Sequence, residues 1–429
     1  MTQVLIIGGG FAGLNAAKAL GRAKDVEVTI VDKSNHHLFQ PLLYQVAMAG
    51  LSPADIAAPI RSLLARYRNT RVLQGEVLKI NLAEKNVQTS FGSLPFDYLI
   101  VCCGARHSYF KHEEWEEFAP GLKTLEQATE IRRRVLSAYE SAERSPDPAE
   151  RKRLLTFVIV GGGPTGVELA GAIGEMSRFT LARDFRNIDA TSARVILIES
   201  GDRILSMFDE SLGTRATRDL EQLGVQVWTN SLVTKIDAQG VEVGSTERIQ
   251  SATVLWAAGV QASPLGRDSG LEVDRQGRII VEPDLSLKAF PNVFVAGDQA
   301  NFSHQTGKPL PGIAPVATQQ GAFIAKLIRR ELKGQPREPF KYFDKGQMAT
   351  IGRSRAIVQV GKIKVTGFIA WLMWLLVHVY FLTGFENRLL VVLQWGWSYL
   401  SFRRGARLIV SKEWRQHPPV TPANNEVHP

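Results

Sequence analysis

The sequence predicts an α/β protein, and three observations predict it: a strand–glycine turn–helix–strand pattern at the start, a second copy of that pattern near the middle, and a long uncharged segment near the end. In the first copy the apolar run 4–7 leads into a glycine turn at 8–13. A helical pattern follows over 14–20, and the next strand, 26–31, ends at Asp32. Two parallel strands with a helix crossing over between them form the repeating unit of α/β sheets.

The same order of elements returns in the second copy. The apolar strand 157–160 precedes a glycine turn at 161–166 and a helical pattern at 167–176. The partner strand ends at Glu199, so this crossover is longer and contains an insertion at about 178–193. We therefore expect two Rossmann-like domains within one chain.

Composition narrows the classes of protein that fit. Hydrophobic residues make up 45% of the 429 residues and charged residues 22%, which is typical of folded domains. The net charge of +9 suits an anionic cofactor, an anionic lipid surface or nucleic acid, but no module for reading nucleic acid is present, so we expect no nucleic-acid partner. The two cysteines, Cys102 and Cys103, are adjacent, which excludes a disulfide scaffold and any four-thiolate metal site, and we expect no metal.

The two glycine turns have the chemistry of dinucleotide-binding loops. In the pattern G-x-G-x-x-G the glycines let the backbone approach a pyrophosphate, and the N-terminus of the following helix offers free N–H groups to that anion. An acid at the end of the next strand accepts hydrogen bonds from ribose hydroxyls and repels a 2′-phosphate, so Glu199 favours NADH over NADPH. The alternative is that both turns only pack a helix on a sheet.

The repeated units resemble the two-dinucleotide-binding-domain flavoproteins, in which the first Rossmann-like domain holds FAD and the second, inserted in the first, holds NADH or NADPH. The strand-to-glycine turns 99–105 and 254–259 carry the same resemblance, as does the strand 293–296 followed by Gly297 and Asp298. The resemblance implies a FAD-binding domain at 1–124 and 285–335, a bridging helix and linker at 125–153, an NADH-binding domain at 154–284, a C-terminal membrane-attachment region at 336–412 and a flexible tail at 413–429.

Within that superfamily the adjacent cysteines exclude enzymes that use a thiol relay, because such a relay needs two separated cysteines. The chain resembles the type II NADH dehydrogenases, which are single-subunit NADH:quinone oxidoreductases. The segments that carry this resemblance are HHLFQPLLYQ (36–45), GGGPTGVELAG (161–171), APVATQQG (314–321), MATIGR (348–353) and a Trp-rich tail that ends in RRGAR (403–407). The family implies hydride transfer from NADH to N5 of non-covalently bound FAD, then two-electron reduction of a membrane quinone, ubiquinone or menaquinone, without proton pumping.

The resemblance also assigns binding residues. The FAD-binding residues would be Gly8, Gly10, Phe11, Ala12, Gly13, Asp32, Lys33, Pro41, Leu42, Val77, Gly104, Asp298 and Ala317. The NADH-binding residues would be Gly161, Gly163, Pro164, Thr165, Gly166, Glu199, Ala258 and Gly259.

Three further residues would serve catalysis. Glu168, expected in the first turn of the second glycine-turn helix, would lie beside the nicotinamide and flavin as a positioning or proton-handling carboxylate, or would be an acid favoured there by the helix dipole alone. Gln319 and Gln320 would donate hydrogen bonds to the quinone, or would be polar residues facing water. Pro315 stands where part of the family has a glutamine, so that glutamine has no counterpart in this chain.

The uncharged segment 365–385 is long enough to cross a bilayer, whereas 389–402 is shorter than the ~20 residues that a spanning helix needs. Tryptophans in both segments, and the arginines within 403–407, are typical of an interface with an anionic leaflet. A span, a re-entrant hairpin and two interfacial helices all fit, as does a buried helix or a homodimer interface. The resemblance implies peripheral or monotopic attachment through 365–407 on the cytoplasmic face of the inner membrane.

Two other functions fit the same residues. One is an NADH-dependent reductase of a soluble acceptor such as ferredoxin, which the basic surface would attract. The other is an NADH-responsive flavoprotein that acts by binding rather than by turnover. The uncharged tail has no role in a reductase of a soluble acceptor, and slow flavin reoxidation by every acceptor would favour the binding protein. Quinone reduction is the prediction.

Overall fold

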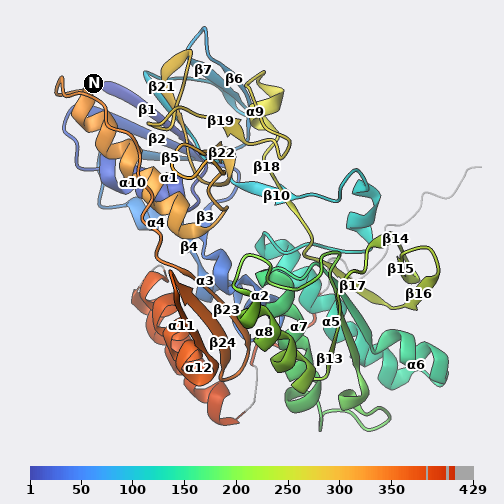
Figure 1. Ribbon diagram of the computed structural model, residues 1–429. Coiled ribbons are helices and arrows are strands. Elements are labelled where there is room, and N and C mark those ends of the chain that lie inside the picture. Colours follow the sequence, from blue (N-terminus) through green and yellow to red (C-terminus); the bar gives the residue numbers. More distant parts are fainter. Residues whose placement is uncertain (383–384, 402–404, 411–429) are drawn as a thin grey trace, which may run out of the picture.

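The computed structural model describes residues 1–382, 385–401 and 405–410 (Figure 1). A mostly parallel sheet and a fully parallel sheet form the cores of two domains, and a smaller antiparallel sheet with two helices lies against the second domain. The predicted flexible tail at 413–429 lies outside the described residues.

The first domain is built on a sheet with the strand order β20–β21–β9–β1–β2–β5. These strands are β1 (Thr2–Ile7), β2 (Val26–Asp32), β5 (Thr70–Gln74), β9 (Tyr98–Val101), β20 (Ser286–Leu287) and β21 (Phe290–Val295). The Val, Leu and Ile residues of β1 and β9 are buried on both faces, as in other parallel sheets. Because β21 comes after the second domain in the chain and pairs with β9, the second domain is inserted in the first, as predicted.

Two long helices of the first domain, α1 (Phe11–Leu20) and α10 (Ala314–Glu331), pack backbone against backbone. A Cβ at Gly321 would lie 2.1 Å from the carbonyl oxygen of Ala12. The other elements of this domain are β3 (His36–Leu38), α2 (Leu43–Ala47), α3 (Pro53–Ile56), β4 (Ala57–Pro59), α4 (Ile60–Leu64), β6 (Val77–Asn81), β7 (Asn86–Thr89), β8 (Gly92–Pro95), α9 (Leu265–Asp268), β19 (Ile279–Ile280) and β22 (Ala300–Asn301).

The second domain has a parallel sheet with the order β13–β12–β11–β17. Its strands and main helices are β11 (Thr156–Val160), α7 (Pro164–Glu175), β12 (Arg194–Ile198), α8 (Glu210–Gln222), β13 (Val225–Trp228) and β17 (Thr253–Trp256). α7 begins earlier than the pattern 167–176 predicts, because Gly163 is its N-cap and Pro164 occupies the first helical position, where proline is well tolerated. The predicted insertion contains a π-helical turn (Met176–Thr180) and a short 3-10 turn (Ala190–Ser192).

The bridging helix is α5 (Leu125–Arg144), followed by α6 (Pro148–Leu154). The hydroxyl oxygen of Thr124 caps α5 by accepting a hydrogen bond from the N–H of Gln127. Two short antiparallel strands, β10 (Ala105–His107) and β18 (Val260–Ala262), pair across the connections between the two domains.

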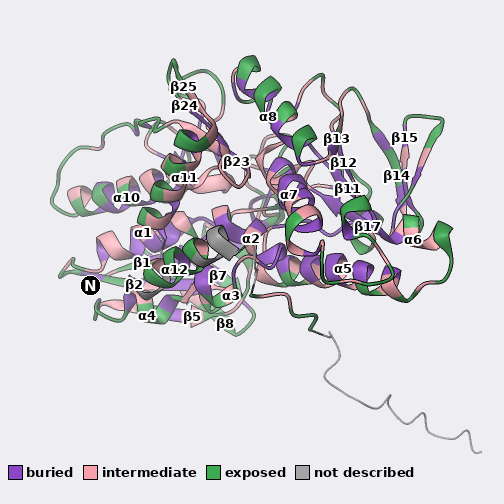
Figure 2. Cartoon of the chain, turned by 90° about the horizontal axis from the view of Figure 1, so that it is seen from below, coloured by how far each residue is buried: buried purple, intermediate pink, exposed green. Residues whose placement is uncertain are grey.

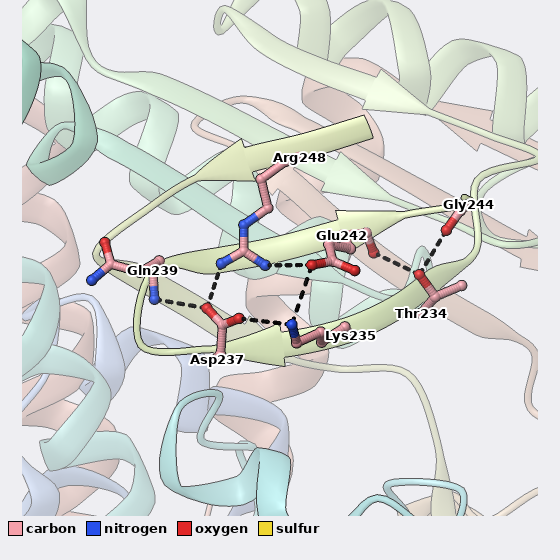
Figure 3. A network of polar contacts seen from close by, with 7 residues as sticks. All are labelled: Thr234, Lys235, Asp237, Gln239, Glu242, Gly244 and Arg248. Carbon is pink, nitrogen blue, oxygen red and sulfur yellow. Dashed lines mark hydrogen bonds and ion pairs between the residues drawn. The ribbon is translucent and has the colours of Figure 1, made fainter. Parts of the chain in front are cut away.

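A three-stranded sheet, β14 (Val233–Asp237), β15 (Gly240–Val243) and β16 (Glu247–Gln250), extends from the second domain. Its surface carries a network in which Arg248 and Lys235 each contact both Asp237 and Glu242 (Figure 3). Partly exposed ion pairs of this kind contribute little stability individually. The four ion pairs join side chains of β14, β15 and β16.

The C-terminal region begins with a sheet rather than a helix. β23 (Gln347–Gly352), β24 (Arg355–Val360) and β25 (Ile363–Thr366) precede α11 (Gly367–Phe381) and α12 (Phe385–Ser401). A Cβ at Gly171 would lie 1.7 Å from the carbonyl oxygen of Ile351, so α7 and β23 are in direct backbone contact. Because β25 extends to Thr366, the uncharged segment 365–385 starts at the end of a strand and continues into α11. Among the residues that the structure describes, no helix is long and apolar enough to cross a membrane.

Candidate active site

The first glycine turn lies between β1 and α1. Of the three glycines of its motif, one has room for a Cβ atom and the other two do not. Gly8 has φ +103°, and a Cβ there would lie 2.3 Å from the carbonyl oxygen of Cys102. A Cβ at Gly13 would lie 1.9 Å from the carbonyl oxygen of Gly8. At Gly10, in contrast, no described atom lies within 4 Å of where a Cβ would stand. The turn is closed by the chain itself and open where a pyrophosphate is expected to approach, so it fits FAD.

Side chains that follow the turn in sequence hold it in place. The two carboxylate oxygens of Asp32 accept hydrogen bonds from the N–H groups of Gly9 and Ser34, both at 2.6 Å. His37 is buried, and its Nδ1 donates to the carbonyl oxygen of Gly9 at 2.9 Å. Burial lowers the pKa of His37 to about 4, so the ring is neutral and supports the turn rather than carrying protons.

The second glycine turn repeats this geometry between β11 and α7. Gly161 has φ +110°, and a Cβ there would lie 2.6 Å from the carbonyl carbon of Ala257. A Cβ at Gly166 would lie 1.9 Å from the carbonyl oxygen of Gly161. At Gly163 the described chain again leaves 4 Å clear around the Cβ position. The predicted Pro164 and Thr165 start α7 directly after this opening.

Glu199 has the same place in the second domain as Asp32 has in the first. Its carboxylate accepts hydrogen bonds from the N–H groups of Gly162 at 2.6 Å and Gly201 at 2.7 Å. The predicted pair Ala258 and Gly259 follows β17 on the same side of the sheet as the glycine turn, and Gly259 has φ +144°.

The start of α10 brings several predicted FAD residues together. The N–H of Gly297 donates to Oε1 of Gln320 at 2.7 Å. A Cβ at Gly297 would lie 3.4 Å from the Cβ of Ala317 and 3.9 Å from the Cβ of Ala12. Asp298, the next residue, therefore lies between α10 and the first glycine turn.

Lys33 directly follows β2, and Val77 begins β6. The N–H of Gly75 donates to the carbonyl oxygen of Asp32 at 2.8 Å, which brings Lys33 and Val77 to one edge of the sheet. Gly104, with φ +70°, follows the end of β9 at the same edge.

Pro41 and Leu42 lie in a 3-10 turn (Gln40–Leu42) directly before α2. Leu42 is completely buried in a core that also contains residues of α5 and α7. The predicted pair therefore leads from the first glycine turn to the segment 43–51, which lies at the junction of the domains.

Glu168 lies in the second turn of α7, not in the first as predicted. Its carboxyl group accepts a hydrogen bond from the backbone N–H of Thr350 in β23, and burial raises its pKa to about 8. The effect of a helix dipole falls off within the first turn, so it does not account for an acid at this position. The carboxyl group is mostly protonated at neutral pH, with a pKa close enough to that pH for proton exchange.

Glu168 lines a partly open pocket with a volume of about 120 Å³. Three parts of the chain form the walls: the segment 43–51 of the first domain, α7 of the second, and β23, α11 and α12 of the C-terminal region. Tyr44, Trp374 and Trp395 form an aromatic wall, with ring centroids 6.5 Å apart for Tyr44–Trp374 and 5.6 Å apart for Trp374–Trp395. Glu175 and Arg353 also line the pocket. Aromatic walls beside the carboxyl group of Glu168 suit a planar, largely apolar ligand.

Gln45 fixes this wall, and the sequence analysis missed its role. Nε1 of Trp395 donates to Oε1 of Gln45 at 2.7 Å, and Nε2 of Gln45 donates to the hydroxyl of Tyr44 at 2.9 Å. Because an indole N–H only donates, the orientation of the amide is determined. Trp374 is buried, so the tail tryptophans predicted to lie at a membrane interface include pocket residues. The signal for Gln45 was its place in the motif 36–45.

Gln319 and Gln320 do not line this pocket. The amide of Gln319 donates to the carbonyl oxygen of Phe343 and accepts from the N–H of Phe343, both at 3.0 Å. Gln320 is buried and bonded to Gly297. Both amides thus bind backbone groups in this structure.

The two cysteines are poor candidates for a redox-active thiol. The thiol of Cys102 donates to the carbonyl oxygen of Gly8 at 3.4 Å. Burial raises the pKa of Cys102 far above its usual range and that of Cys103 to about 12, so both thiols stay protonated at neutral pH.

The fold and the two open glycine turns define an oxidoreductase with two dinucleotide sites. Residues 2–321 match the family model for pyridine nucleotide-disulphide oxidoreductases. The chain is 46% identical to the type II NADH:quinone oxidoreductase Ndh of Mycobacterium tuberculosis, over 96% of this chain and 91% of that one. It therefore belongs to the pyridine nucleotide-disulphide oxidoreductases and, within them, to the type II NADH:quinone oxidoreductase family, which confirms the predicted FAD cofactor and NADH:quinone activity.

Solved structures share this fold. NDH2 from Plasmodium falciparum, solved in complex with NADH, has a TM-score of 0.87 at 19% identity and covers 96% of this chain and 100% of its own. The sulfide:quinone oxidoreductase of Aquifex aeolicus has a TM-score of 0.74 at 19% identity and covers 90% of this chain and 92% of its own. At these identities the likeness concerns the fold.

Proposed function

We propose that this NADH:quinone oxidoreductase works at a membrane surface and that the ring of the quinone binds in the pocket that contains Glu168. The observation that carries the proposal is the position of this pocket. It lies between α7, which starts at the NADH turn, and the two apolar C-terminal helices. FAD, when bound, supplies the redox centre that accepts two electrons from NADH and passes them on. Its pyrophosphate would contact the opening at Gly10, and that of NADH the opening at Gly163.

Glu168 would supply protons. Reduction of a quinone to a quinol takes two electrons and two protons, whereas NADH releases two electrons and one proton, so a second proton must come from water. A carboxyl group with a pKa of about 8 holds a proton at neutral pH and can pass it to a quinone oxygen. Its hydrogen bond from Thr350 keeps it oriented during the exchange.

Gln319 and Gln320 would then stabilise the backbone at the FAD site rather than contact the quinone. Gln320 holds the turn at Gly297 against α10, and Gln319 ties α10 to Phe343. Both therefore support the start of α10, where the predicted FAD residue Ala317 lies.

The membrane contact would use the outer sides of α11 and α12. α11 buries Ala370, Trp374 and His378 on its inner side. Large apolar side chains on the outer side are exposed, and Figure 2 colours exposed residues green along α11. These exposed residues are Phe368, Ile369, Leu372, Leu376, Val377, Tyr380 and Phe381 of α11 and Leu389, Leu390, Val392 and Leu393 of α12. Exposed large apolar side chains along two helices are typical of helices that lie in a bilayer interface.

One of the tail arginines predicted to face an anionic leaflet is paired within the protein. Arg403 and Arg404 lie outside the described residues, and Arg407 forms an ion pair with Asp184 of the second domain. The apolar side chains therefore carry the proposed attachment. The enzyme would sit on the cytoplasmic face of the inner membrane, where NADH is available.

The membrane contact is tested by the double substitution Leu372→Glu and Leu376→Glu. These side chains are 42% and 59% exposed, so charges there leave the core intact but oppose insertion among lipids. We expect the variant to stay in solution with anionic phosphatidylglycerol vesicles that sediment the wild type, while NADH oxidation with ferricyanide is unchanged. Leu232→Glu, 62% exposed on the second domain, is the matched control and should still sediment.

Equal sedimentation of the double variant and the wild type would contradict the proposal. A wild type that does not sediment, together with a dimer that the double variant converts to monomer, would assign this surface to a second copy of the chain instead.

A further inference from the structure

Arg132 of α5 is a buried cation in an unusual setting. It is 7% exposed, and among the described residues it has no carboxylate partner. Its guanidinium donates three hydrogen bonds, all to backbone carbonyl oxygens: Val46 at 2.8 Å, Leu51 at 3.0 Å and Ala406 at 3.1 Å. A buried charge that is solvated only by carbonyl dipoles costs free energy, so the contacts it makes need a reason.

The first two carbonyls lie on either side of a bend in the pocket wall. Val46 belongs to α2 and Leu51 follows it, and between them Met48 and Gly50 line the pocket. Ala49 has φ +56°, a conformation that alanine rarely adopts. The guanidinium closes the bend 46–51 by bonding both ends, and this offsets the strain within it.

The third carbonyl connects the bend to the end of the C-terminal region. Ala406 follows α12, whose Trp395 bonds to Gln45 one residue before Val46. Nε2 of Gln394 also donates to Oδ1 of Asp55 at 3.4 Å. The first-domain segment 43–55 is therefore held by α5 on one side and by the C-terminal region on the other.

We propose that Arg132 is a positioning residue for quinone: it holds the bend 46–51 against the C-terminal region and so sets the shape of the pocket. This inference rests on the proposed quinone site. It requires that loss of the guanidinium impairs the quinone reaction and leaves the reaction of NADH with the flavin intact. Burial lowers the pKa of Arg132, in keeping with a charge held by dipoles alone.

Helix α5 carries a second arginine that provides a matched control. Arg134, on the same helix, also donates to backbone carbonyls, those of Glu117 and Phe118, each at 2.8 Å, and pairs with Glu130. None of these residues lines the pocket. Arg134→Met therefore removes a comparable set of bonds from α5 without touching the bend.

The test uses the full-length, FAD-loaded protein and the variants Arg132→Met, Arg132→Lys and Arg134→Met. Steady-state kinetics with a short-chain ubiquinone analogue is compared with kinetics using ferricyanide, which needs no pocket. We expect Arg132→Met, which loses all three hydrogen bonds and so releases the bend, to raise KM for the quinone about tenfold, with ferricyanide turnover unchanged. Arg132→Lys, which keeps the charge and some donors, should lie between, and Arg134→Met should match the wild type.

An unchanged quinone KM in Arg132→Met would overturn the inference while leaving the proposed function intact. Equal loss of quinone and ferricyanide turnover in both methionine variants, with a matching fall in Tm, would show a merely structural role and also overturn it. If Arg132→Met does not fold, Arg132→Lys tests the inference instead. Its quinone KM should then be raised while its ferricyanide turnover is unchanged, and an unchanged quinone KM would overturn the inference. A wild type that reduces ferricyanide but no quinone would overturn the proposed acceptor and this inference together.

Discussion

Replacing Gly10 by alanine is expected to give a folded protein that has lost its flavin. In the structure no described atom lies within 4 Å of the added Cβ, and the backbone at Gly10 is extended with φ −70°, which any residue adopts. The chain therefore tolerates the methyl group, whereas a pyrophosphate that approaches the backbone does not. The measurement is the ratio of flavin to protein absorbance after purification, which should fall by more than about tenfold.

Gly13→Ala provides the contrast in the same turn. Its Cβ would lie 1.9 Å from the carbonyl oxygen of Gly8, so the start of α1 must move, at a cost of about 1–3 kcal/mol or more. Both variants should lack flavin, but only Gly13→Ala should melt below the wild-type protein stripped of FAD. That comparison is needed because bound FAD itself stabilises the native state. Full flavin content in Gly10→Ala would contradict the assignment of this turn to FAD.

Glu168→Gln is expected to slow the reaction with quinone about 100-fold, which is the lower end of the contribution of a general acid. Glutamine has the same shape and keeps the hydrogen bond from Thr350, but it cannot release a proton. Reduction of the flavin by NADH should change far less. In the wild type the quinone step should decline as pH rises through about 8, because the protonated form is the donor, and this decline should be absent in the variant. Equal pH profiles in the two proteins would contradict the role of Glu168.

The same pKa predicts a change in stability. In the unfolded chain Glu168 loses its proton near the ordinary value of 4.5, whereas in the native state it keeps the proton up to about pH 8. The native state thus binds more protons between these values, so the free energy of unfolding falls as pH rises across that window. The Tm of Glu168→Gln relative to wild type should therefore rise from pH 5 to pH 8 and then level off. A constant difference would show that the carboxyl group is not buried.

Local sequence patterns predicted most of the fold. The glycine turns, the strands around them and the acids Asp32 and Glu199 are set by short-range rules of spacing and conformation, and the structure has them where the pattern indicates. The insertion of one domain in the other is what the resemblance to the two-dinucleotide-binding-domain flavoproteins implies, with the strand that begins at 293 returning to the first domain. The pattern places the start of α7 at residue 167 rather than 164, because it assigns Pro164 to the glycine turn.

The pocket was not predictable in the same way. Its walls come from segments around residues 45, 168, 350 and 395, and only tertiary packing brings them together. The sequence does not distinguish a tryptophan that faces lipid, as predicted, from one that lines a pocket, as Trp374 does. Arg132 had no signal either, because its partners are backbone carbonyls, which any residue supplies.

The most direct test of the account is a stopped-flow measurement of flavin absorbance in two steps. The purified protein is first mixed with NADH, or separately with NADPH, and the reduced protein is then mixed with a short-chain quinone. The account predicts rapid bleaching by NADH, much slower bleaching by NADPH because Glu199 repels a 2′-phosphate, and rapid recovery of absorbance with quinone. Bleaching by NADH without recovery on addition of quinone would contradict it and favour a soluble acceptor or a signalling role.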